Sequence, residues 1–351
     1  MTERHATPDG LLILPRLRVQ NANAISSPHT WGFPAPTAIL GFVHALERRL
    51  AGRYHPRFGG VGIVCHHFEA QTFKPNRRQH RVFTQSRNPV YLKRDAAKFI
   101  AEGTPAAIVE EGRTHLEVTL LIAVHGDFDE DLEREDFALA AFDTAQGMRL
   151  AGGSLLPPGP RTPKAEWVGW PAAQREQHAV FRRLRRRLLP GFALVHRPDL
   201  LGERLAKLQA EQTDSSVLDA LLDLTRLNHS PVLPEAAGDA PPPDKVNWQI
   251  ERRPGWLVPL PIGYAGISEL HAPGSVANSR DATTPFRFVE SLLSLGQWIG
   301  PHRLNSLEQL LWYHGCDPQA GLYRCINRYA ELLPAGDDTA SASPDSDLQG
   351  A

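Results

Sequence analysis

Four histidines are the side chains of this sequence best suited to acid-base chemistry: His29, His66, His67 and His80. Two histidines can serve as the base and the acid of metal-independent RNA cleavage, in which a 2′-hydroxyl attacks the adjacent phosphate. His66 and His67 follow one another in an expected strand, where consecutive side chains point to opposite faces, so we do not expect them to act together on one phosphate. Because the sequence assembles no other histidine pair, we predict no catalytic residue.

The three cysteines indicate neither a disulfide framework nor a metal site. Cys65, Cys316 and Cys325 are odd in number and far from any CxxC spacing, which suits a reducing compartment. His314 together with the two later cysteines matches no zinc pattern. No apolar run approaches the roughly 18 residues that a membrane span needs. We therefore expect a cytoplasmic protein with no metal, no cofactor and no membrane contact.

A polar and aromatic loop at residues 21–35 is the first candidate for binding. It contains Asn21, Asn23, Ser26, Ser27, His29 and Trp31. The loop lies where an expected strand leads into the N-terminus of an expected helix, so it offers amide, hydroxyl and backbone N–H donors beside an aromatic face. This combination suits phosphates and splayed bases. The alternative is that Ser and Asn cap turns while Trp31 and Phe33 fill the core, and the residue types alone favour this alternative.

Charge is segregated along the chain, although the net charge is only −1. Residues 74–98 hold eight Lys or Arg against one acid, and residues 175–187 hold six Arg against one Glu. Acids dominate at residues 127–136 and after residue 334. Local basic patches on a neutral chain predict a specific polyanion contact, with a solvated charged surface as the alternative. The candidate contacts are Arg77, Arg78, His80, Arg81 and Arg87 in the first patch, and Arg182, Arg183 and Arg186 in the second.

The elements that must position these residues follow from hydrophobic spacing. Alternation predicts strands at residues 11–20, 61–65, 116–124 and 149–156, the last entered through a glycine turn, and helical spacing predicts helices at 36–50 and 132–148. A basic insertion separates the second and third strands. The order of strand, helix, strand, strand, helix, strand is the split βαβ pattern of an α+β, ferredoxin-like fold, which by itself implies no function.

The C-terminal half is expected to be a mixed helical and irregular β extension packed on the ferredoxin-like unit. We expect a loop at 157–171, a strand at 192–196, helices at 174–189, 200–227, 286–298 and 306–314, a surface linker at 231–244, and at 256–264 an irregular edge strand whose prolines cannot donate to a neighbour. The chain thus divides into a ferredoxin-like unit at 1–156, the extension at 157–332 and a disordered acidic tail at 333–351.

Several long sequence words resemble one family of proteins. They are LPRLRVQNANAISSP at 14–28, TWGFP at 30–34, GFVHAL at 41–46, GIVCHHFEAQ at 62–71, AIVEEGRTHLEV at 107–118, RLAGGS at 149–154, LPGFALV at 189–195, PGWLVP at 254–259 and LWYH at 311–314. With these words the sequence resembles the second Csy subunit of type I-F CRISPR surveillance complexes, a member of the Cas-five group. The resemblance covers most of the chain. It is weakest at 53–58, at 91–103, in the proline-rich linker and in the acidic tail.

The resemblance implies an RNA-recognition-like palm with an inserted thumb, residues 74–112, that holds the 5′ handle of a guide RNA. It implies a heterodimer with a large Cas-eight-type subunit, contact with Csy-three-type backbone subunits, and target DNA recognition through the assembled complex in antiviral defence. It implies no catalytic role. Gly152 and Gly153 would let the backbone approach RNA, with Arg149 beside them as a further RNA contact, although a tight turn with positive φ explains the same glycines.

The resemblance and the residues together leave some alternatives open. The sequence lacks the Lys/Arg-Gly-aromatic motif that stacks bases on a sheet, so we expect loops and thumb, rather than the open sheet face, to hold the RNA. A metal-independent endoribonuclease that processes precursor guide RNA is the second hypothesis. A stand-alone DNA-binding regulator is disfavoured, since the sequence contains no helix-turn-helix or zinc pattern. The helix at 174–189 could meet target DNA, guide RNA, the large subunit or only solvent.

Overall fold

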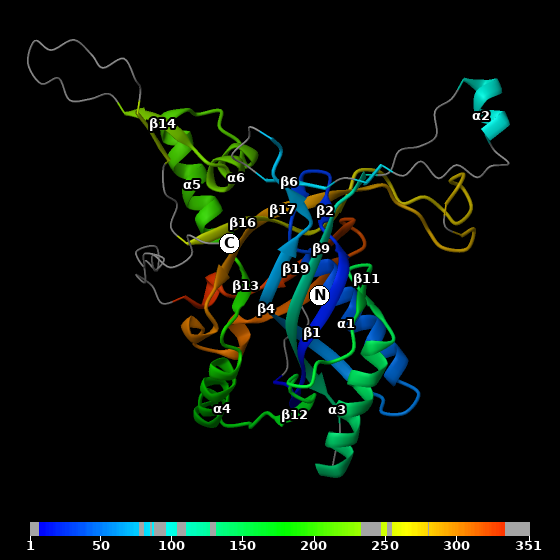
Figure 1. Cartoon of the computed structure of the whole chain (residues 1–351), viewed down its shortest axis with the longest axis vertical. Coiled ribbons are helices and arrows are strands. Elements are labelled where there is room, and N and C mark those ends of the chain that lie inside the picture. The colour runs from blue at the N-terminus through cyan, green and yellow to red at the C-terminus, as the bar shows by residue number, and fades with distance from the viewer. Residues whose placement is uncertain are drawn as a thin grey trace, which may run out of the picture.

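One large antiparallel sheet runs through the protein, with helices packed against both of its faces (Figure 1). The computed structural model describes residues 7–76, 81–84, 86–87, 96–103, 110–126, 131–232, 247–250, 255–279 and 281–333. In this part of the chain the sheet has 11 strands and there are six α-helices, so the mixed α and β composition expected from the sequence is confirmed.

The N-terminal part of the sheet has the strand order β11-β1-β9-β4, with neighbouring strands antiparallel. The strands are β1 (Gly10–Asn23), β4 (Arg57–Ala70), β9 (Arg113–His125) and β11 (Gly153–Leu155). Helix α1 (Pro36–Leu50) connects β1 to β4, and α3 (Asp131–Gln146) follows β9. Each element lies where the hydrophobic spacing predicted it, within a few residues. The expected fourth strand is split by its turn into β10 (Arg149–Leu150) and β11.

Helix α1 forms for local reasons that the sequence displays. Pro36 occupies the first helical position, where its fixed φ is already helical and its missing N–H costs nothing. Ile39, Leu46 and Leu50 lie on one buried face, and basic residues occupy the last turn, where they complement the helix dipole. This face packs with α3 on the side chains of β1, β4 and β9 that point to one side of the sheet.

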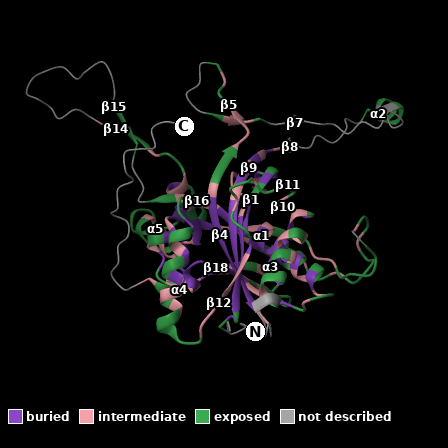
Figure 2. Ribbon diagram, turned by 60° about the horizontal axis from the view of Figure 1, so that its bottom comes forward, coloured by how far each residue is buried: buried purple, intermediate pink, exposed green. Residues whose placement is uncertain are grey.

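The opposite face of the same strands is covered over only part of its length. Helix α4 (Gln174–Arg187) buries Phe181 and Leu184 against Leu11 and Ile13 of β1 and Leu121 of β9. This covered end is the one where β1 begins, and the buried strands there lie between two helical layers (Figure 2). Toward the other end of β1 and β9, side chains on this face are polar and partly exposed.

Beyond β4 the sheet closes into a ring of six strands that the sequence did not predict. The ring runs β4-β13-β17-β16-β19-β18, and β18 returns to β4 by pairing Leu311 with Gly62 and Trp312 with Val61. Its other members are β13 (Phe192–His196), β16 (Trp256–Gly266), β17 (Val289–Ile299), β18 (Leu311–Asp317) and β19 (Leu322–Asn327). Trp312 is fully buried, and its indole N–H donates to Leu194 O over 2.8 Å.

Three expectations for the C-terminal half are wrong, and a fourth holds over part of its length. Residues 286–298 and 306–314 were expected to be helices, but they contribute strands β17 and β18, with the short 3-10 helix η2 (Leu307–Gln309) before β18. The expected loop at 157–171 contains β12 (Glu166–Gly169), which pairs with β1. The expected irregular edge strand at 256–264 is confirmed at residues 256–261, for which the structure describes pairing with β17 on one side, whereas Gly263–Ala265 also pair with β19. Apolar runs buried on both sides carry no clear period, which explains the helix errors.

The remaining elements lie around the sheet. They are α5 (Pro198–Glu211) and α6 (Val217–Thr225), the hairpin of β14 (His229–Val232) and β15 (Asn247–Ile250), the short strands β2 (Ile25–Ser27), β3 (Thr30–Trp31), β5 (Thr72–Phe73), β6 (Val82–Phe83), β7 (Ser86–Arg87) and β8 (Glu110–Glu111), helix α2 (Ala96–Glu102), and the 3-10 helices η1 (Pro301–Arg303) and η3 (Ala330–Leu332). Helices α5 and α6 pack on strands β16 and β17 of the sheet, whereas helix α2 lies apart from the sheet in both views (Figures 1 and 2).

Several expectations concern residues beyond this description. Most of the expected linker, residues 233–244, and all but residue 333 of the acidic tail lie outside the described residues. The linker's first two residues, Pro231 and Val232, belong to β14. Among the described residues, the helices are too short or too polar to cross a membrane.

Candidate nucleic-acid interface

The polar loop after β1 folds into a small hairpin, β2–β3, whose hydroxyl groups bond within the hairpin. The Ser27 and Thr30 hydroxyls lie 2.7 Å apart and are buried, and the His29 backbone N–H donates to Ser27 Oγ over 3.3 Å. Ser26 Oγ donates to Phe33 O over 2.9 Å. These are turn-stabilising bonds, and they leave the His29 side chain exposed at the tip of the hairpin.

The aromatic residues of the loop pack against neighbouring strands. The Trp31 ring lies 5.2 Å from the Phe83 ring, and Phe33 makes an edge contact with Trp298 at 4.8 Å. Trp31 and Phe33 both line an apolar pocket of about 220 Å³, whose lining also includes Phe68 and Trp256. Trp31 is only partly buried, so one part of its ring stays accessible from this pocket.

A second, more polar groove lies at the N-terminus of α1. Its volume is about 290 Å³, and its lining includes Asn23, Ser26, Thr37, Gly152 and Tyr264. The N-cap residue of α1 provides no side-chain cap, and the first turn contains no acid. The Thr37 backbone N–H makes no hydrogen bond among the described residues. The positive end of the helix dipole therefore faces this groove, whose other lining is partly apolar and whose Asn23 and Ser26 side chains bond Ile25 and Phe33. The free N–H at the helix end is the group best suited to an anion.

The turn between β10 and β11 forms one wall of this groove. Ala151 and Gly152 both have positive φ, +49° and +76°, as a two-residue hairpin turn requires. The Asn23 backbone N–H donates to Ala151 O over 2.8 Å, and the exposed Arg149 donates to Gly152 O over 3.1 Å. The turn is thus fixed to the end of β1, and its Gly152 side is open to solvent.

Gly153 serves a different purpose from its neighbour. A methyl group added there would lie 2.7 Å from Val19 Cγ1 and 2.8 Å from Ala22 N, so glycine is needed for β11 to approach β1 closely. At Gly152, by contrast, an added methyl group would meet open space. Of the two glycines, therefore, only Gly152 leaves room for another molecule.

The sheet face opposite α1 and α3 carries a separate polar network. Asn21 has a φ of +58°, and its backbone N–H donates to His115 Nδ1 over 3.2 Å. Its side-chain oxygen accepts from Gln71 Nε2 over 2.6 Å. The network turns Asn21 away from the α1 groove, whose lining does not include it.

His66 and His67 contradict the expectation that they face opposite sides of the sheet. A bulge in β4 between Cys65 and His67 brings both onto one face: His66 Nε2 lies 2.7 Å from Thr119 Oγ1, and His67 pairs in register with Glu117. Glu117 and Thr119 are two residues apart in β9 and so share a face. A bulge adds one residue to the strand and reverses the alternation, which sequence spacing alone does not reveal.

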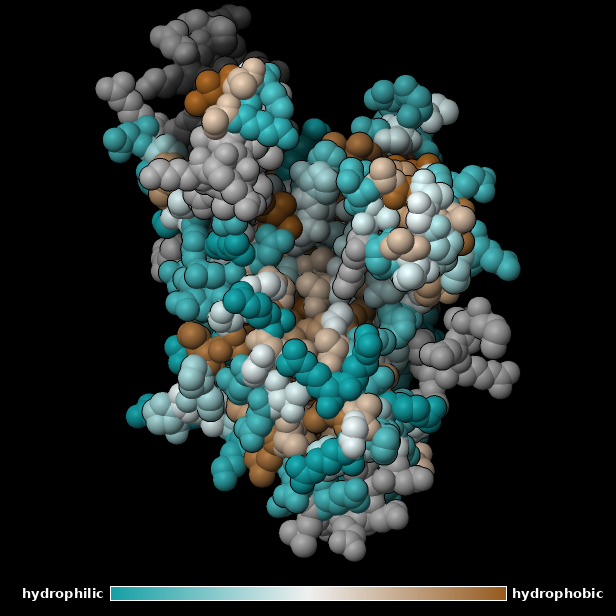
Figure 3. Space-filling view, turned by 90° about the vertical axis from the view of Figure 1, so that its right-hand side faces the viewer, coloured by the Kyte–Doolittle hydropathy of each residue, from teal (hydrophilic) through white to brown (hydrophobic). Residues whose placement is uncertain are grey.

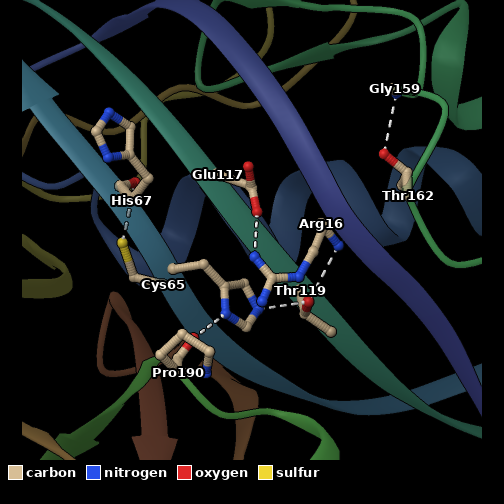
Figure 4. Close-up of polar contacts among 9 residues, drawn as sticks. Arg16, Cys65, His67, Glu117, Thr119, Gly159, Thr162 and Pro190 are labelled. Atoms are coloured by element: carbon tan, nitrogen blue, oxygen red, sulfur yellow. Dashed lines mark hydrogen bonds and ion pairs between the residues drawn. The ribbon is translucent and has the colours of Figure 1, made fainter.

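The surroundings of His66 nevertheless occupy its ring. Its second nitrogen, Nδ1, lies 2.7 Å from Pro190 O, so both ring nitrogens have partners (Figure 4). Burial lowers the pKa of His66, and the nearby Arg16 guanidinium adds to this effect. Arg16 itself is paired with Glu117. The neutral imidazole is held between two strands and a loop.

The basic candidates that the structure describes belong to two separate elements, the insertion after β5 and helix α4. Arg81 donates to Thr72 Oγ1 over 2.9 Å at the base of the insertion, and Arg87 lies in β7. Arg77, Arg78 and His80 lie outside the described residues. Arg182, Arg183 and Arg186 are exposed on α4, near the start of β1, whereas the α1 groove lies near its end.

The structure thus brings together only part of the predicted set. Asn23, Ser26 and Gly152 meet at the α1 groove, with Arg149 fixed to the same turn. The sequence reasoning missed Thr37 and Tyr264. Thr37 could have been found as the first N–H after Pro36 in an uncapped helix, whereas Tyr264 comes from a distant strand and has no local signal. Seen from the side where α1 and β11 lie, the surface is mostly hydrophilic and is hollowed in its upper half between two projections (Figure 3).

Within the described residues, no group of three or more His, Cys, Asp or Glu side chains is arranged to hold a metal ion. Comparison with known proteins adds two findings. A family model described as CRISPR-associated protein (Cas_Csy2) matches residues 12–325. A protein of Pseudomonas aeruginosa (strain UCBPP-PA14) named CRISPR-associated protein Csy2 is 50% identical over 323 residues, which cover 90% of this chain and 95% of that protein.

Proposed function

The chain belongs to the Csy2 family of CRISPR-associated proteins, and from this premise we propose that it binds the 5′ handle of a guide RNA as a non-catalytic subunit of a type I-F CRISPR complex. The observation that carries the proposal is the groove at the uncapped N-terminus of α1. A free backbone N–H, the helix dipole and an exposed glycine turn can bind a phosphate there without a charged side chain in the groove.

The strand order supports a ferredoxin-like palm as the framework of this site. In such a palm the first and third strands lie at the centre, and the two helices cover one face. The order β11-β1-β9-β4, with α1 after the first strand and α3 after the third, fits this pattern. The palm places the end of β1, the start of α1 and the β10–β11 turn at one point, so the groove follows from the topology.

We further propose that residues 74–112 form a thumb that contacts the guide RNA and a backbone subunit. Its basic composition supports RNA contact, and α2 lies away from the sheet, where it is free to meet a neighbour. A large subunit would complete a heterodimer, and target DNA would be recognised by the cytoplasmic assembly. The exposed aromatic residues Phe68, Phe192 and Trp256 beside the apolar pocket are suited to protein contact.

The bulge in β4 places His66 and His67 on one face, where a histidine pair could supply the acid and the base of RNA cleavage. We nevertheless propose that the chain is not catalytic, because of the surroundings of His66. Thr119 Oγ1 and Pro190 O lie within hydrogen-bond distance of the two ring nitrogens of His66, so a substrate would have to displace one of them to exchange a proton with this ring. Its lowered pKa also favours the neutral ring at pH 7, and a general acid needs the imidazolium form. The endoribonuclease hypothesis therefore lacks an acid at this position.

The test is to purify the chain with its complex, add handle-bearing guide RNA and precursor RNA without metal, and measure binding and cleavage together. We expect salt-sensitive binding that depends on the handle, with the precursor intact. Cleavage that disappears in a His66→Ala or His67→Ala variant would overturn the non-catalytic assignment. Binding that is equal for handle-bearing and scrambled RNA would overturn handle recognition.

A further inference from the structure

The arginines of α4 form a row on the side of the helix that faces away from the sheet. Phe181, Leu184 and Leu188 mark the buried side. With 3.6 residues per turn, Arg175, Arg182 and Arg186 lie within about 40° of one another on the opposite side. Their spacing along the axis is about 10 Å and about 6 Å. We call these three residues the α4 row.

Among the described residues, the side chains of the α4 row are unpaired, as is that of Arg183, whereas the two remaining arginines of the helix have partners. Arg187 pairs with Glu166, and Arg185 donates to Leu304 O. None of the three row side chains has a hydrogen bond or ion pair within the part of the chain that the structure describes, and all three residues are exposed. Fold stability therefore does not account for them, apart from the contribution of Arg186 to the C-terminal dipole.

The surroundings of the row add positive charge and a concave surface. A shallow hollow of about 760 Å³ beside it is lined by His178, Arg185 and Asn305 together with row residues. Glu176 is the only acid of α4, and it lies near the row at the start of the helix. The result is a local excess of positive charge, which attracts a polyanion over a range of several ångströms.

We propose that the α4 row binds the phosphate backbone of double-stranded DNA. A straight, rigid row suits a rigid duplex. The exposed side of α4 has no Phe, Tyr or Trp, and His178 is its one ring on which an unpaired base could stack, which favours a duplex over single-stranded RNA. It also has no large apolar residue to anchor a protein partner, which disfavours an acidic protein. Without other side chains to read base edges, the contact would be independent of sequence.

The location of the row separates this contact from the proposed RNA site. Helix α4 packs where β1 begins, and the α1 groove lies where β1 ends, roughly 40 Å away for a strand of this length. The two polyanions would be held at opposite ends of one sheet. The inference rests on the proposed function in one respect, because the duplex would be met by the complex that carries the guide RNA.

The experiment compares three forms of the purified complex in binding a random-sequence DNA duplex of about 40 base pairs across a salt series. The row variant carries Arg175→Gln, Arg182→Gln and Arg186→Gln. The matched control carries Arg48→Gln, Arg49→Gln and Arg57→Gln, which remove equal charge from exposed positions on other elements. A lysine version of the row variant keeps the charge and serves where glutamine impairs folding.

We expect the row variant to flatten the slope of log K against log salt by about 2.7, the value for three lost phosphate contacts. Between about 50 and 200 mM salt, its affinity should therefore fall about 40-fold less than that of the wild type. The control and the lysine version should keep the wild-type slope. Guide-RNA binding, measured in parallel with a handle RNA, should be unchanged.

Three results would overturn the inference: a row variant with the wild-type slope, a control with an equally flattened slope, or glutamine and lysine row variants that both fail to assemble into the complex. The last result would assign the row to a protein partner. Loss of handle-RNA binding in the row variant, with DNA binding retained, would assign it to RNA instead. If wild-type protein bound no handle RNA, the proposed function would fail while the DNA slope still tested the row.

Discussion

A glutamate placed at position 37 should stabilise the protein and weaken its binding to RNA. Thr37 is the second residue of α1, the helix has no cap and no acid in its first turn, and the side chain lines the groove. A carboxylate there complements the helix dipole, so Thr37→Glu should raise the free energy of unfolding by about 0.3–1 kcal/mol. The same carboxylate would repel a phosphate bound at the helix end.

The size of that repulsion follows from the geometry. At about 5 Å and an effective dielectric constant of about 20–80, two unit charges repel by roughly 0.8–3.3 kcal/mol, which weakens binding roughly 4-fold to 250-fold. The assay is filter binding of handle RNA to the complex, with urea unfolding of the same variants. Thr37→Gln is the matched control, since glutamine has nearly the same shape as glutamate but no charge.

Two results would refute this reasoning. If Thr37→Glu and Thr37→Gln bound RNA equally while the glutamate still stabilised the fold, the helix end would be free but would bind no phosphate. If the glutamate destabilised the protein relative to glutamine, the N-terminus of α1 would not be the open, positive end that the structure describes. A plain turn-capping loop predicts the first of these results, so the pair of variants separates the two interpretations.

Three further predictions concern stability and reactivity. Gly153→Ala should lower the free energy of unfolding by about 1–3 kcal/mol, because its methyl group would lie 2.7 Å from Val19 Cγ1. Gly152→Ala should lower it by about 1 kcal/mol, because alanine is strained at the positive φ of this residue. Equal urea midpoints for the two variants would contradict this. Burial lowers the pKa of His196 from 6.5 to about 4, so the unfolded state binds more protons between these values. The contribution of neutral His196 to the free energy of unfolding should therefore be fully present above about pH 6.5, and up to about 3 kcal/mol of it should be lost as the pH falls toward 4. A His196→Asn variant with the same pH dependence as the wild type would refute this assignment. Cys316 is exposed, whereas the other two cysteines are buried with pKa values raised to about 12, so a thiol reagent should modify one cysteine in the native protein and three after unfolding; rapid modification of all three would contradict the packing.

The parts of the fold with a local signal were predictable. Helix α1 begins at Pro36 and ends at Leu50, as its proline, apolar spacing and basic last turn indicated. Strand β13 occupies residues 192–196, as expected from its apolar run after a Pro-Gly pair. In these elements propensity, pattern and termination agree, so tertiary contacts had nothing to override.

The ring of strands was not predictable from local pattern. In β17, the six residues from Ser294 to Ile299 are all buried, so the strand lacks the alternation that distinguishes strands from helices. Closure of the ring depends on pairing Leu311 with Gly62, residues that are remote in sequence. A glycine in β4 at this point suits the close contact, since an added methyl group would lie 2.7 Å from Leu310 Cγ.

The candidate site was half predictable for the same reason. Residue type identified Asn23, Ser26 and Gly152, which belong to segments with turn chemistry. Thr37 has an unremarkable side chain and contributes its backbone, and Tyr264 arrives from β16. The bulge that places His66 and His67 on one face is likewise a product of pairing with β9 and leaves no trace in the order of residues.

The central claim is that the α1 groove binds the guide-RNA handle, and cross-linking tests it most directly. A handle RNA carrying a photoreactive base at each position in turn would be bound to the complex and irradiated, and the cross-linked peptides of this chain identified. If the handle binds in the α1 groove, we expect cross-links to residues 21–37 and 149–153. Cross-links that avoid both segments and fall on α4 or on the α5–α6 region would contradict it.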